Sequence, residues 1–143
     1  MILIVCVDDD GGMMFNNRRQ SRDSAVIKKI AVISSESILW ISGYTKELFT
    51  DPGGSNIRVS DEPALCAGPG EFCFLEDTSP GKFADRAEKL IIFRWNRRYP
   101  SDVKFDIDPD AEDAASGKRW KKESSLDFAG TSHDKITEEI FTK

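Results

Sequence analysis

The chain has 143 residues, enough for one domain with a buried core, and 39% of them are hydrophobic. Its 20 basic and 25 acidic side chains leave a formal net charge of −5, and a field of that sign repels polyanions, so we expect no nucleic-acid partner. No apolar run approaches the roughly 20 residues that span a bilayer, so we expect no membrane partner. Basic residues still cluster at Arg18–Arg22 and at Arg94–Arg98, which leaves room for a local anion site. The composition predicts a single cytoplasmic domain covering residues 1–143.

The cysteines and the histidine argue against a metal site. The three cysteines, Cys6, Cys66 and Cys73, lie among apolar residues, which predicts reduced core thiols in a cytoplasmic protein. His133 is the one histidine, and no Cys-x-x-Cys pair occurs. We therefore expect no metal cofactor from these residues.

The first part of the chain alternates between apolar strands and helical segments. Ile2–Val7 is a continuous apolar run before an acidic, glycine-containing turn, which is typical of a strand buried on both faces of a parallel sheet. Apolar residues then recur with the helical period from Val26 to Ile33, and Ser21 can cap that helix. The other predicted elements of this part are, in order, Ile38–Ser42 (strand), Tyr44–Phe49 (helix), Ile57–Val59 (strand), Glu62–Ala67 (helix), Glu71–Leu75 (strand), Gly81–Arg86 (helix) and Lys89–Trp95 (strand).

After Trp95 the pattern changes to short strands between turn-rich segments. Val103–Ile107, Arg119–Phe128 and Lys135–Phe141 lack a strong helical period and are predicted to be antiparallel strands. The acidic stretch 106–118 is predicted to be a solvated loop. Strand–helix alternation followed by terminal strands predicts an α/β domain whose mixed sheet is mostly parallel, with an antiparallel C-terminal hairpin and flanking helices.

The first strand runs into the sequence Asp8-Asp9-Asp10-Gly11. This stretch resembles, by its spacing, the Asp-x-Asp-Gly motif that ends a buried strand in haloacid-dehalogenase-like phosphatases. The resemblance implies Asp8 as the nucleophile, Asp10 as the acid/base, and Mg²⁺ near Asp8, Asp10 and Asp77. The motif is incomplete, because Gly12 stands where those phosphatases have Thr or Val and no distal metal aspartate follows Asp77. We keep a Mg²⁺-dependent phosphatase as an alternative.

A second resemblance runs through the whole chain. The segment FADRAEKLIIFRWNRRYPSDVKFDID combines a short helix, an apolar strand, a polar turn and Asp-x-x-Phe, and Trp120 and two terminal strands follow it. This order resembles the C-terminal third of dihydrofolate reductase, and CVDDDGGM resembles that family's first strand and the start of its mobile loop. The resemblance implies a dihydrofolate-reductase-like domain with a shortened middle.

The same resemblance implies a cleft beside the first strand. SRDSAVIKKI resembles the family's Leu-Pro-x-Asp-Leu helix start, which sets Asp23 as the acid that meets the pterin. The other residues that would line the former pterin cleft are Cys6, Ile27, Leu75 and Phe93. The loop Met13–Arg22 lacks the Pro-Trp that packs over substrate and nicotinamide in the reductases.

The departures from the family argue against NADPH. Where the reductases have Ile-Gly-Gly-Gly, whose amides approach a pyrophosphate, this chain has FLEDTSP, with Glu76 and Asp77. At about 5 Å and an effective dielectric constant of about 20, each like-charge pair costs about 3 kcal/mol, so two pairs cancel several orders of magnitude in affinity. In addition, Tyr44 replaces the cofactor-binding arginine, and Phe93 replaces the threonine that orients the catalytic acid.

The leading hypothesis is therefore a non-reductase descendant of this fold that uses no NADPH. Its cleft either binds a small planar or nucleotide-like ligand or has closed into core. A second alternative is a protein-interaction module whose partner docks on the Arg94–Tyr99 surface, where aromatic and basic side chains alternate. His133 is interpreted as a turn residue rather than a catalytic base, because no serine or cysteine nucleophile motif accompanies it.

The chain also resembles a group of short bacterial proteins that carry the label ribonuclease Z. A nuclease of the metallo-β-lactamase type needs several histidines in an HxHxDH cluster, and this chain has one histidine. We therefore do not expect that activity.

Overall fold

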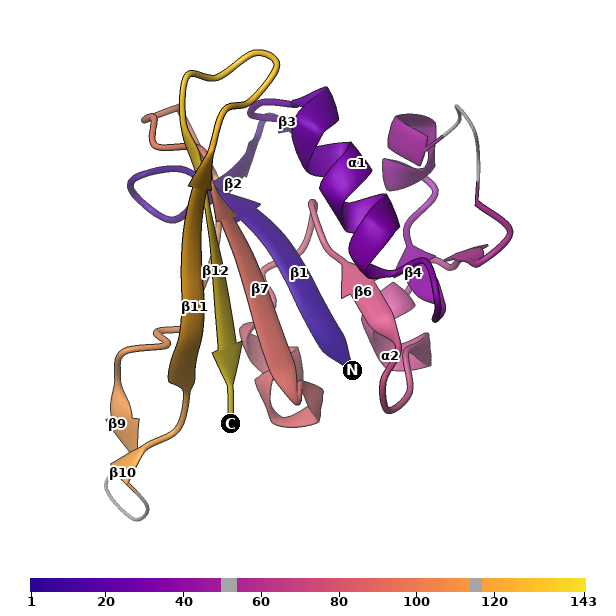
Figure 1. The fold of residues 1–143 in the computed structure, drawn as a ribbon, viewed down its shortest axis with the longest axis vertical. Coiled ribbons are helices and arrows are strands. Elements are labelled where there is room, and N and C mark those ends of the chain that lie inside the picture. The colour runs from indigo at the N-terminus through magenta and orange to yellow at the C-terminus, as the bar shows by residue number, and fades with distance from the viewer. Residues whose placement is uncertain (50–53, 114–116) are drawn as a thin grey trace.

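A computed structural model describes residues 1–49, 54–113 and 117–143 (Figure 1). Its main body is a seven-stranded sheet in the order β11-β12-β7-β1-β6-β4-β5. The strands of this sheet are β1 (Ile2–Val7), β4 (Leu39–Ile41), β5 (Ile57–Val59), β6 (Phe72–Phe74), β7 (Lys89–Arg94), β11 (Lys121–Phe128) and β12 (Ile136–Thr142).

The sheet is mixed, as the sequence predicts. β1 lies between β6 and β7 and runs parallel to both, so that Ile4 pairs with Phe74 on one side and with Ile91 on the other. β4 and β5 continue the parallel part. β12 pairs antiparallel with β7, and β11 pairs antiparallel with β12 at the edge of the sheet. The mostly parallel sheet with an antiparallel C-terminal hairpin is confirmed.

The helices and the smaller sheets surround this body. The helical elements are α1 (Ser24–Ile33), η1 (Thr45–Phe49), α2 (Pro63–Cys66) and η2 (Gly81–Arg86). A three-stranded sheet in the order β3-β2-β8 joins β2 (Gly12–Phe15), β3 (Arg18–Arg19) and β8 (Val103–Lys104). A small hairpin joins β9 (Glu112–Asp113) and β10 (Gly117–Lys118) and extends from the lower end of the molecule in Figure 1.

β1 is buried on both faces, which explains its unbroken apolar sequence. Leu3 and Val5 belong to one core cluster, and Ile4 belongs to the cluster on the other face. α1 covers that second face (Figure 1), because Val26 and Ile30 recur at helical spacing and both are fully buried.

The start of α1 differs from the prediction. Asp23, rather than Ser21, is the N-cap residue, and its side chain accepts a hydrogen bond from the amide of Ala25. Both residue types favour this position, so local sequence alone does not choose between them. The choice moves the start of the helix by two residues, and Ser21 is left outside it.

Four other expectations from the sequence are corrected. The loop Met13–Arg22 contains most of the β2–β3 hairpin, and the strand expected at Val103–Ile107 is limited to the two residues of β8. The acidic stretch 106–118 contains β9 and β10, and residues 114–116 lie outside the described part. The cysteines are free, but only Cys73 is fully buried, and Cys66 is exposed because it ends the short helix α2 at the surface.

Four segments meet at the upper edge of the sheet in Figure 1: the ends of β1 and β7, the start of α1, and the loop that joins β11 to β12. Parallel strands place their carboxyl ends at one edge, and the antiparallel β12 starts there. Within the described residues, no helix combines the length and the apolar character that crossing a membrane requires.

Candidate functional site

Asp23 is buried at the start of α1, and both of its carboxylate oxygens are fully used. Oδ1 accepts hydrogen bonds from the amides of Ala25 and Thr131, each at 2.9 Å. Oδ2 accepts from the amide of Ser132 at 2.7 Å and lies 2.9 Å from Nδ1 of His133. Burial opposes ionisation, but these bonds, with that from His133 the strongest, outweigh it and lower the pKa of Asp23 to about 2. Asp23 is therefore a carboxylate over the ordinary pH range.

His133 connects this carboxylate to two hydroxyl groups. Its Nε2 atom lies 2.9 Å from Oγ of Ser21 and 3.0 Å from the hydroxyl of Tyr99. An ionised carboxylate only accepts hydrogen bonds, so Nδ1 of the neutral ring carries the proton and Nε2 accepts from a hydroxyl. The indole of Trp95 stacks on the imidazole, with ring centroids 4.7 Å apart and planes 20° apart. These contacts fix both the tautomer and the orientation of the ring.

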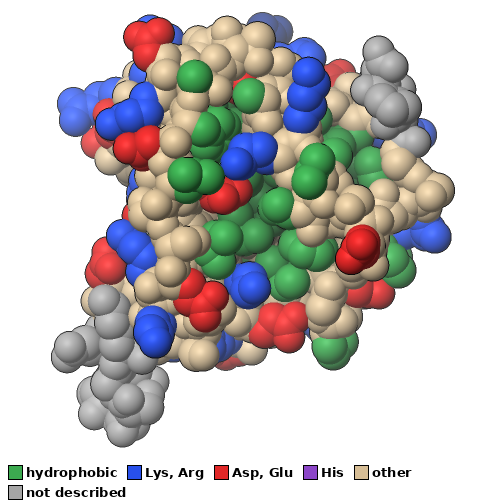
Figure 2. All heavy atoms as spheres, viewed as in Figure 1, with side chains coloured by type: hydrophobic (Ala, Val, Ile, Leu, Met, Phe, Trp, Pro, Cys, Tyr) green, Lys and Arg blue, Asp and Glu red, His purple; other side chains and the backbone are tan. Residues whose placement is uncertain are grey.

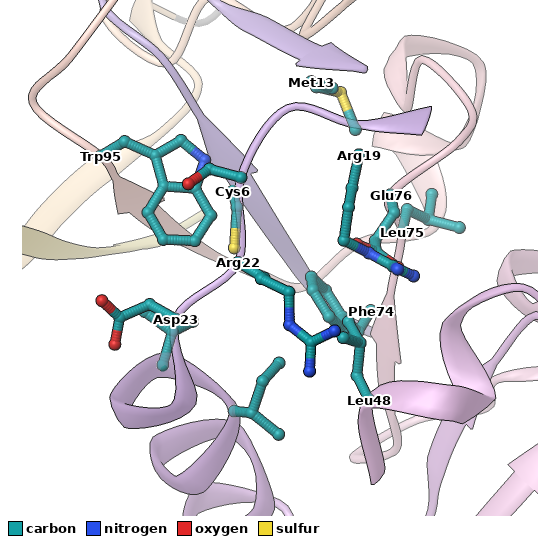
Figure 3. Close-up of a pocket in the computed structure, with 13 residues that line it drawn as sticks. Cys6, Met13, Arg19, Arg22, Asp23, Leu48, Phe74, Leu75, Glu76 and Trp95 are labelled. Atoms are coloured by element: carbon teal, nitrogen blue, oxygen red, sulfur yellow. The ribbon is translucent and has the colours of Figure 1, made fainter. Parts of the chain in front are cut away.

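A pocket lies next to this network, between the end of β1, α1 and β6 (Figure 3). Four of the five residues expected to line the pterin cleft come together there: Cys6, Asp23, Ile27 and Leu75. Phe93 does not join them, because its ring is fully buried in the core and packs edge-to-face on Phe128.

The pocket is narrow. Its enclosed space is about 20 Å³, which is room for about one water molecule. In Figure 3 the carboxylate of Asp23 points away from the guanidinium of Arg22, which reaches across the middle of the view. A neighbouring groove of about 260 Å³ shares Arg22, Asp23, Ile27 and Leu48 with the pocket. The two therefore adjoin and form one larger depression along α1.

Arg19 and Glu76 form an ion pair on the far side of the pocket. Nε and Nη2 of Arg19 lie 2.9 Å and 3.0 Å from the two carboxylate oxygens of Glu76, a bidentate arrangement. Thr45 donates a third hydrogen bond to Glu76, at 2.9 Å. The guanidinium of Arg19 also pairs with Glu47 and lies over the ring of Tyr44, 4.3 Å from its centroid. This pair closes one side of the pocket.

Arg22 is the cation that remains available. It is exposed and lines both the pocket and the neighbouring groove, where Lys28 is a second cation. Its guanidinium has no hydrogen bond or ion pair with any residue of the described ranges 1–49, 54–113 and 117–143. Figure 2 shows hydrophobic side chains gathered in a hollow across the middle of one face, with charged side chains standing among them.

The opening aspartates have a different environment from the one a phosphatase needs. The oxygens of Asp8 accept hydrogen bonds from the amides of Asp10, Gly12 and Tyr99 and from the side chain of Gln20, at 2.6–3.1 Å. Burial opposes ionisation of Asp8, but these bonds lower its pKa below the usual value. Asp8 thus closes a turn.

The other acids of the phosphatase motif do not join Asp8. Asp10 is half-exposed and pairs with Arg98 at 2.9 Å. Asp77 lines a separate pocket of about 130 Å³ with Asp61, Glu62 and Lys82. Among the described residues, no group of three or more His, Cys, Asp or Glu side chains is placed to hold a metal ion. The phosphatase alternative is not supported.

The Arg94–Tyr99 segment does not present one continuous surface. Arg94 pairs with Glu139, and Trp95 is buried against His133. The hydroxyl of Tyr99 points into the His133 network. Only the polar turn between them is fully exposed, so the interaction-module alternative is not supported either.

A comparison with solved structures finds dihydrofolate reductase from Enterococcus faecalis, complexed with NADP(H) and RAB-propyl. The similarity covers 99% of this chain and 94% of that chain, with a TM-score of 0.65 and 12% sequence identity. The chain has the dihydrofolate-reductase-like fold. No family model matches the sequence, and no curated protein matches it. At 12% identity the likeness concerns the fold alone, and it agrees with the order of motifs in the sequence.

Sequence reasoning found Asp23 and the edge of the pocket, but it missed the group around His133. Ser21 was considered only as a helix cap, and His133 was interpreted as a turn residue rather than a catalytic base. The turn is observed, since residues 129–135 join β11 to β12, but the buried imidazole inside it contacts Ser21 and Tyr99. One usable signal was the rarity of histidine in this chain.

Proposed function

We propose that this protein is not an NADPH-dependent reductase and that the depression along α1 binds a small planar or nucleotide-like anion. The observation that carries the proposal is the exposed guanidinium of Arg22, which has no partner in the described ranges and lines a pocket that combines apolar and polar side chains. An arginine held in this way binds a carboxylate or a phosphate with two parallel hydrogen bonds.

The lining supports a ligand with one apolar, flat part and one anionic part. Ile27 and Leu48 line both the pocket and the adjoining groove and supply apolar contacts, and Arg22 supplies the charge. The enclosed space of about 20 Å³ is too small for a ring system, so the ring lies in the adjoining groove of about 260 Å³. That volume is close to the lower end of about 300 Å³ for small-molecule sites.

The residues after β6 support the proposal that NADPH does not bind, but the argument now depends on Asp77 rather than on Glu76. The charge of Glu76 is offset by Arg19, so the repulsion expected from Glu76 is largely removed. Asp77 still opposes the binding of an anion, because it lines a pocket with two further acids, Asp61 and Glu62, and one cation, Lys82. A pocket with three acids and one base repels a pyrophosphate group.

A reducing compartment such as the cytoplasm fits the three free cysteines.

Isothermal titration calorimetry with pterin-6-carboxylate and with AMP tests the binding proposal. We expect saturable binding of at least one of them, lost in Arg22→Glu and kept in Arg97→Glu. Arg97 is a matched control, because it is also an exposed arginine without a partner in the described ranges, on the polar turn after β7. Equal binding by the wild type and Arg22→Glu would contradict the proposal. Saturable NADPH oxidation with dihydrofolate would contradict its non-reductase part.

A further inference from the structure

Three polar side chains beside the pocket form a continuous hydrogen-bonded chain. Oγ of Ser21 lies 2.9 Å from Nε2 of His133, and Nδ1 of His133 lies 2.9 Å from Oδ2 of Asp23. Because Nδ1 donates to the carboxylate, Nε2 is left as an acceptor for the hydroxyl proton of Ser21. Ser21 itself lines the pocket, so a bound molecule can reach its oxygen.

We propose that Ser21 is a catalytic nucleophile, with His133 as its general base and Asp23 as a positioning residue, in the hydrolysis of small carboxylic esters. A serine hydroxyl is a weak nucleophile until an adjacent base takes its proton, and the base needs a third group that fixes its tautomer. The three side chains stand in that order. The proposal deepens the proposed function and rests on its pocket, since it assigns a substrate class to the same depression.

The neighbouring nucleophiles are less suitable. Burial, followed by the charge of Glu76, raises the pKa of the Cys6 thiol well above its usual value, so Cys6 stays protonated and unreactive. The hydroxyl of Ser24 lies 2.8 Å from that of Thr131 and has no contact with the imidazole. Two hydroxyls lie beside Nε2 of His133, those of Ser21 and Tyr99, and of these two residues Ser21 lines the pocket.

The reaction balances without any group beyond the ester and water. Oγ of Ser21 bonds to the carbonyl carbon as its proton passes to Nε2 of His133. The tetrahedral intermediate then collapses, the bond to the alcohol oxygen breaks, and the alcohol leaves with the proton from His133. A water molecule next attacks the acyl-serine and gives a proton to His133, which returns it to Ser21 as the carboxylic acid leaves.

The hydroxyl of Tyr99 is placed to stabilise the negative charge that develops on the carbonyl oxygen. It lies 3.4 Å from Oγ of Ser21, and the carbonyl oxygen of the intermediate is bonded to the carbon that Oγ attacks. Arg22, on the same pocket, adds a positive field. The enclosed space of about 20 Å³ is small, so the smallest acyl groups are favoured as substrates.

Covalent labelling with an alkyl fluorophosphonate tests the nucleophile directly. The reagent forms a phosphorus–oxygen bond with an activated serine and releases fluoride. Mass mapping of the intact chain should find the label on Ser21 in the wild type. We expect at least 100-fold slower labelling in Ser21→Ala and unchanged labelling in Ser35→Ala, an exposed serine at the other end of α1. A label elsewhere, or none, would overturn the proposal.

Hydrolysis of 4-nitrophenyl esters separates the roles. We expect kcat/KM for the acetate to fall at least about 100-fold in Ser21→Ala and in His133→Gln, with no further fall in the double variant, because the two act as a unit. Asp23→Asn should lower kcat and leave KM unchanged, and the octanoate should react far more slowly than the acetate. Additive losses in the double variant would overturn the assignment. Ser21→Ala removes one oxygen, so thermal unfolding of that variant should match the wild type.

The same set of variants distinguishes this inference from the proposed function. Loss of pterin-6-carboxylate binding in Arg22→Glu tests the anion site, whereas labelling of the wild type and of Ser21→Ala with an uncharged fluorophosphonate tests the nucleophile, because the reagent needs Ser21 and His133 but no anion site. Labelling of Ser21 without any binding of pterin-6-carboxylate or AMP would leave the nucleophile in place and contradict only the anion proposal. Binding of pterin-6-carboxylate or AMP without labelling of Ser21 would contradict the nucleophile and leave the anion proposal in place.

Discussion

Asp8 and Asp23 are two buried carboxylates at the same edge of the sheet, and each accepts four hydrogen bonds from the protein. The donors to Asp8 are three backbone amides and the amide side chain of Gln20. The donors to Asp23 are three backbone amides and the imidazole of His133. Asp8 therefore fixes backbone and the side chain of Gln20, whereas Asp23 fixes an imidazole that itself contacts two hydroxyls.

This difference teaches that a buried acid cannot be assigned a role from its burial or its pKa. Hydrogen bonds lower the pKa of both carboxyl groups, and both side chains are nearly inaccessible to solvent. What separates them is one donor, because an imidazole has a second nitrogen that can take up a proton, whereas the amide oxygen of Gln20 is far too weak a base to do so. The chemistry we propose for Asp23 follows from that second nitrogen.

The largest expected effect comes from deleting each carboxylate. Asp23→Ala should lower the free energy of unfolding by about 4 kcal/mol, because it leaves four buried donors unpaired, and Asp8→Ala should lower it by about 3 kcal/mol. Urea denaturation measures both values. Asp9→Ala is the control, since Asp9 is exposed between them in sequence, and it should change stability by less than about 0.5 kcal/mol. If Asp23→Ala left the free energy of unfolding unchanged, the four donors would be hydrogen-bonded to water instead.

A matched pair of glycines tests the packing against each carboxylate. A Cβ atom at Gly130 would lie 2.5 Å from Oδ2 of Asp23, and one at Gly12 would lie 2.7 Å from Oδ2 of Asp8. Each alanine variant should lose about 3 kcal/mol of stability because the neighbouring groups must move.

Only Gly130→Ala should also slow the labelling of Ser21, which would sharpen the contrast between the two acids. Gly43→Ala is the control, because a Cβ atom there meets nothing within 4 Å. Thermal denaturation and mass mapping provide the two measurements. Equal labelling by both glycine variants would mean that the Asp23 side is no more functional than the Asp8 side.

The smallest of these effects is the pH dependence of stability that Asp23 contributes. Its pKa is about 2 in the folded state, below the usual value of 3.8, so the ionised form stabilises the fold. The contribution is complete above about pH 4 and is lost as the pH falls through about 2, and it amounts to about 2 kcal/mol. The stability difference between the wild type and Asp23→Asn should narrow by this amount from pH 5 to pH 2. A constant difference would mean that Asp23 has an ordinary pKa.

The sequence by itself determined the strands of the sheet and its mostly parallel character with an antiparallel C-terminal hairpin. The apolar runs of β1 and β7 and the helical spacing from Val26 to Ile33 are local signals, since each element buries a face set by its own period. The order of motifs also indicated the dihydrofolate-reductase-like fold and located Cys6, Ile27 and Leu75 around the pocket. The elements depend on residues close together in the chain, whereas the fold and the residues of the cleft were implied by the resemblance of the whole order of motifs.

Only the tertiary structure decided what Asp23 contacts. Its partners in the β11–β12 loop lie more than 100 residues away in sequence, and two of them are backbone amides, which every residue except proline offers and which no sequence pattern marks. His133 meets Ser21 because the antiparallel β12 begins at the edge where the parallel β1 and β7 end. That meeting depends on sheet topology, a property of the whole chain, whereas helix and strand periods are properties of short segments.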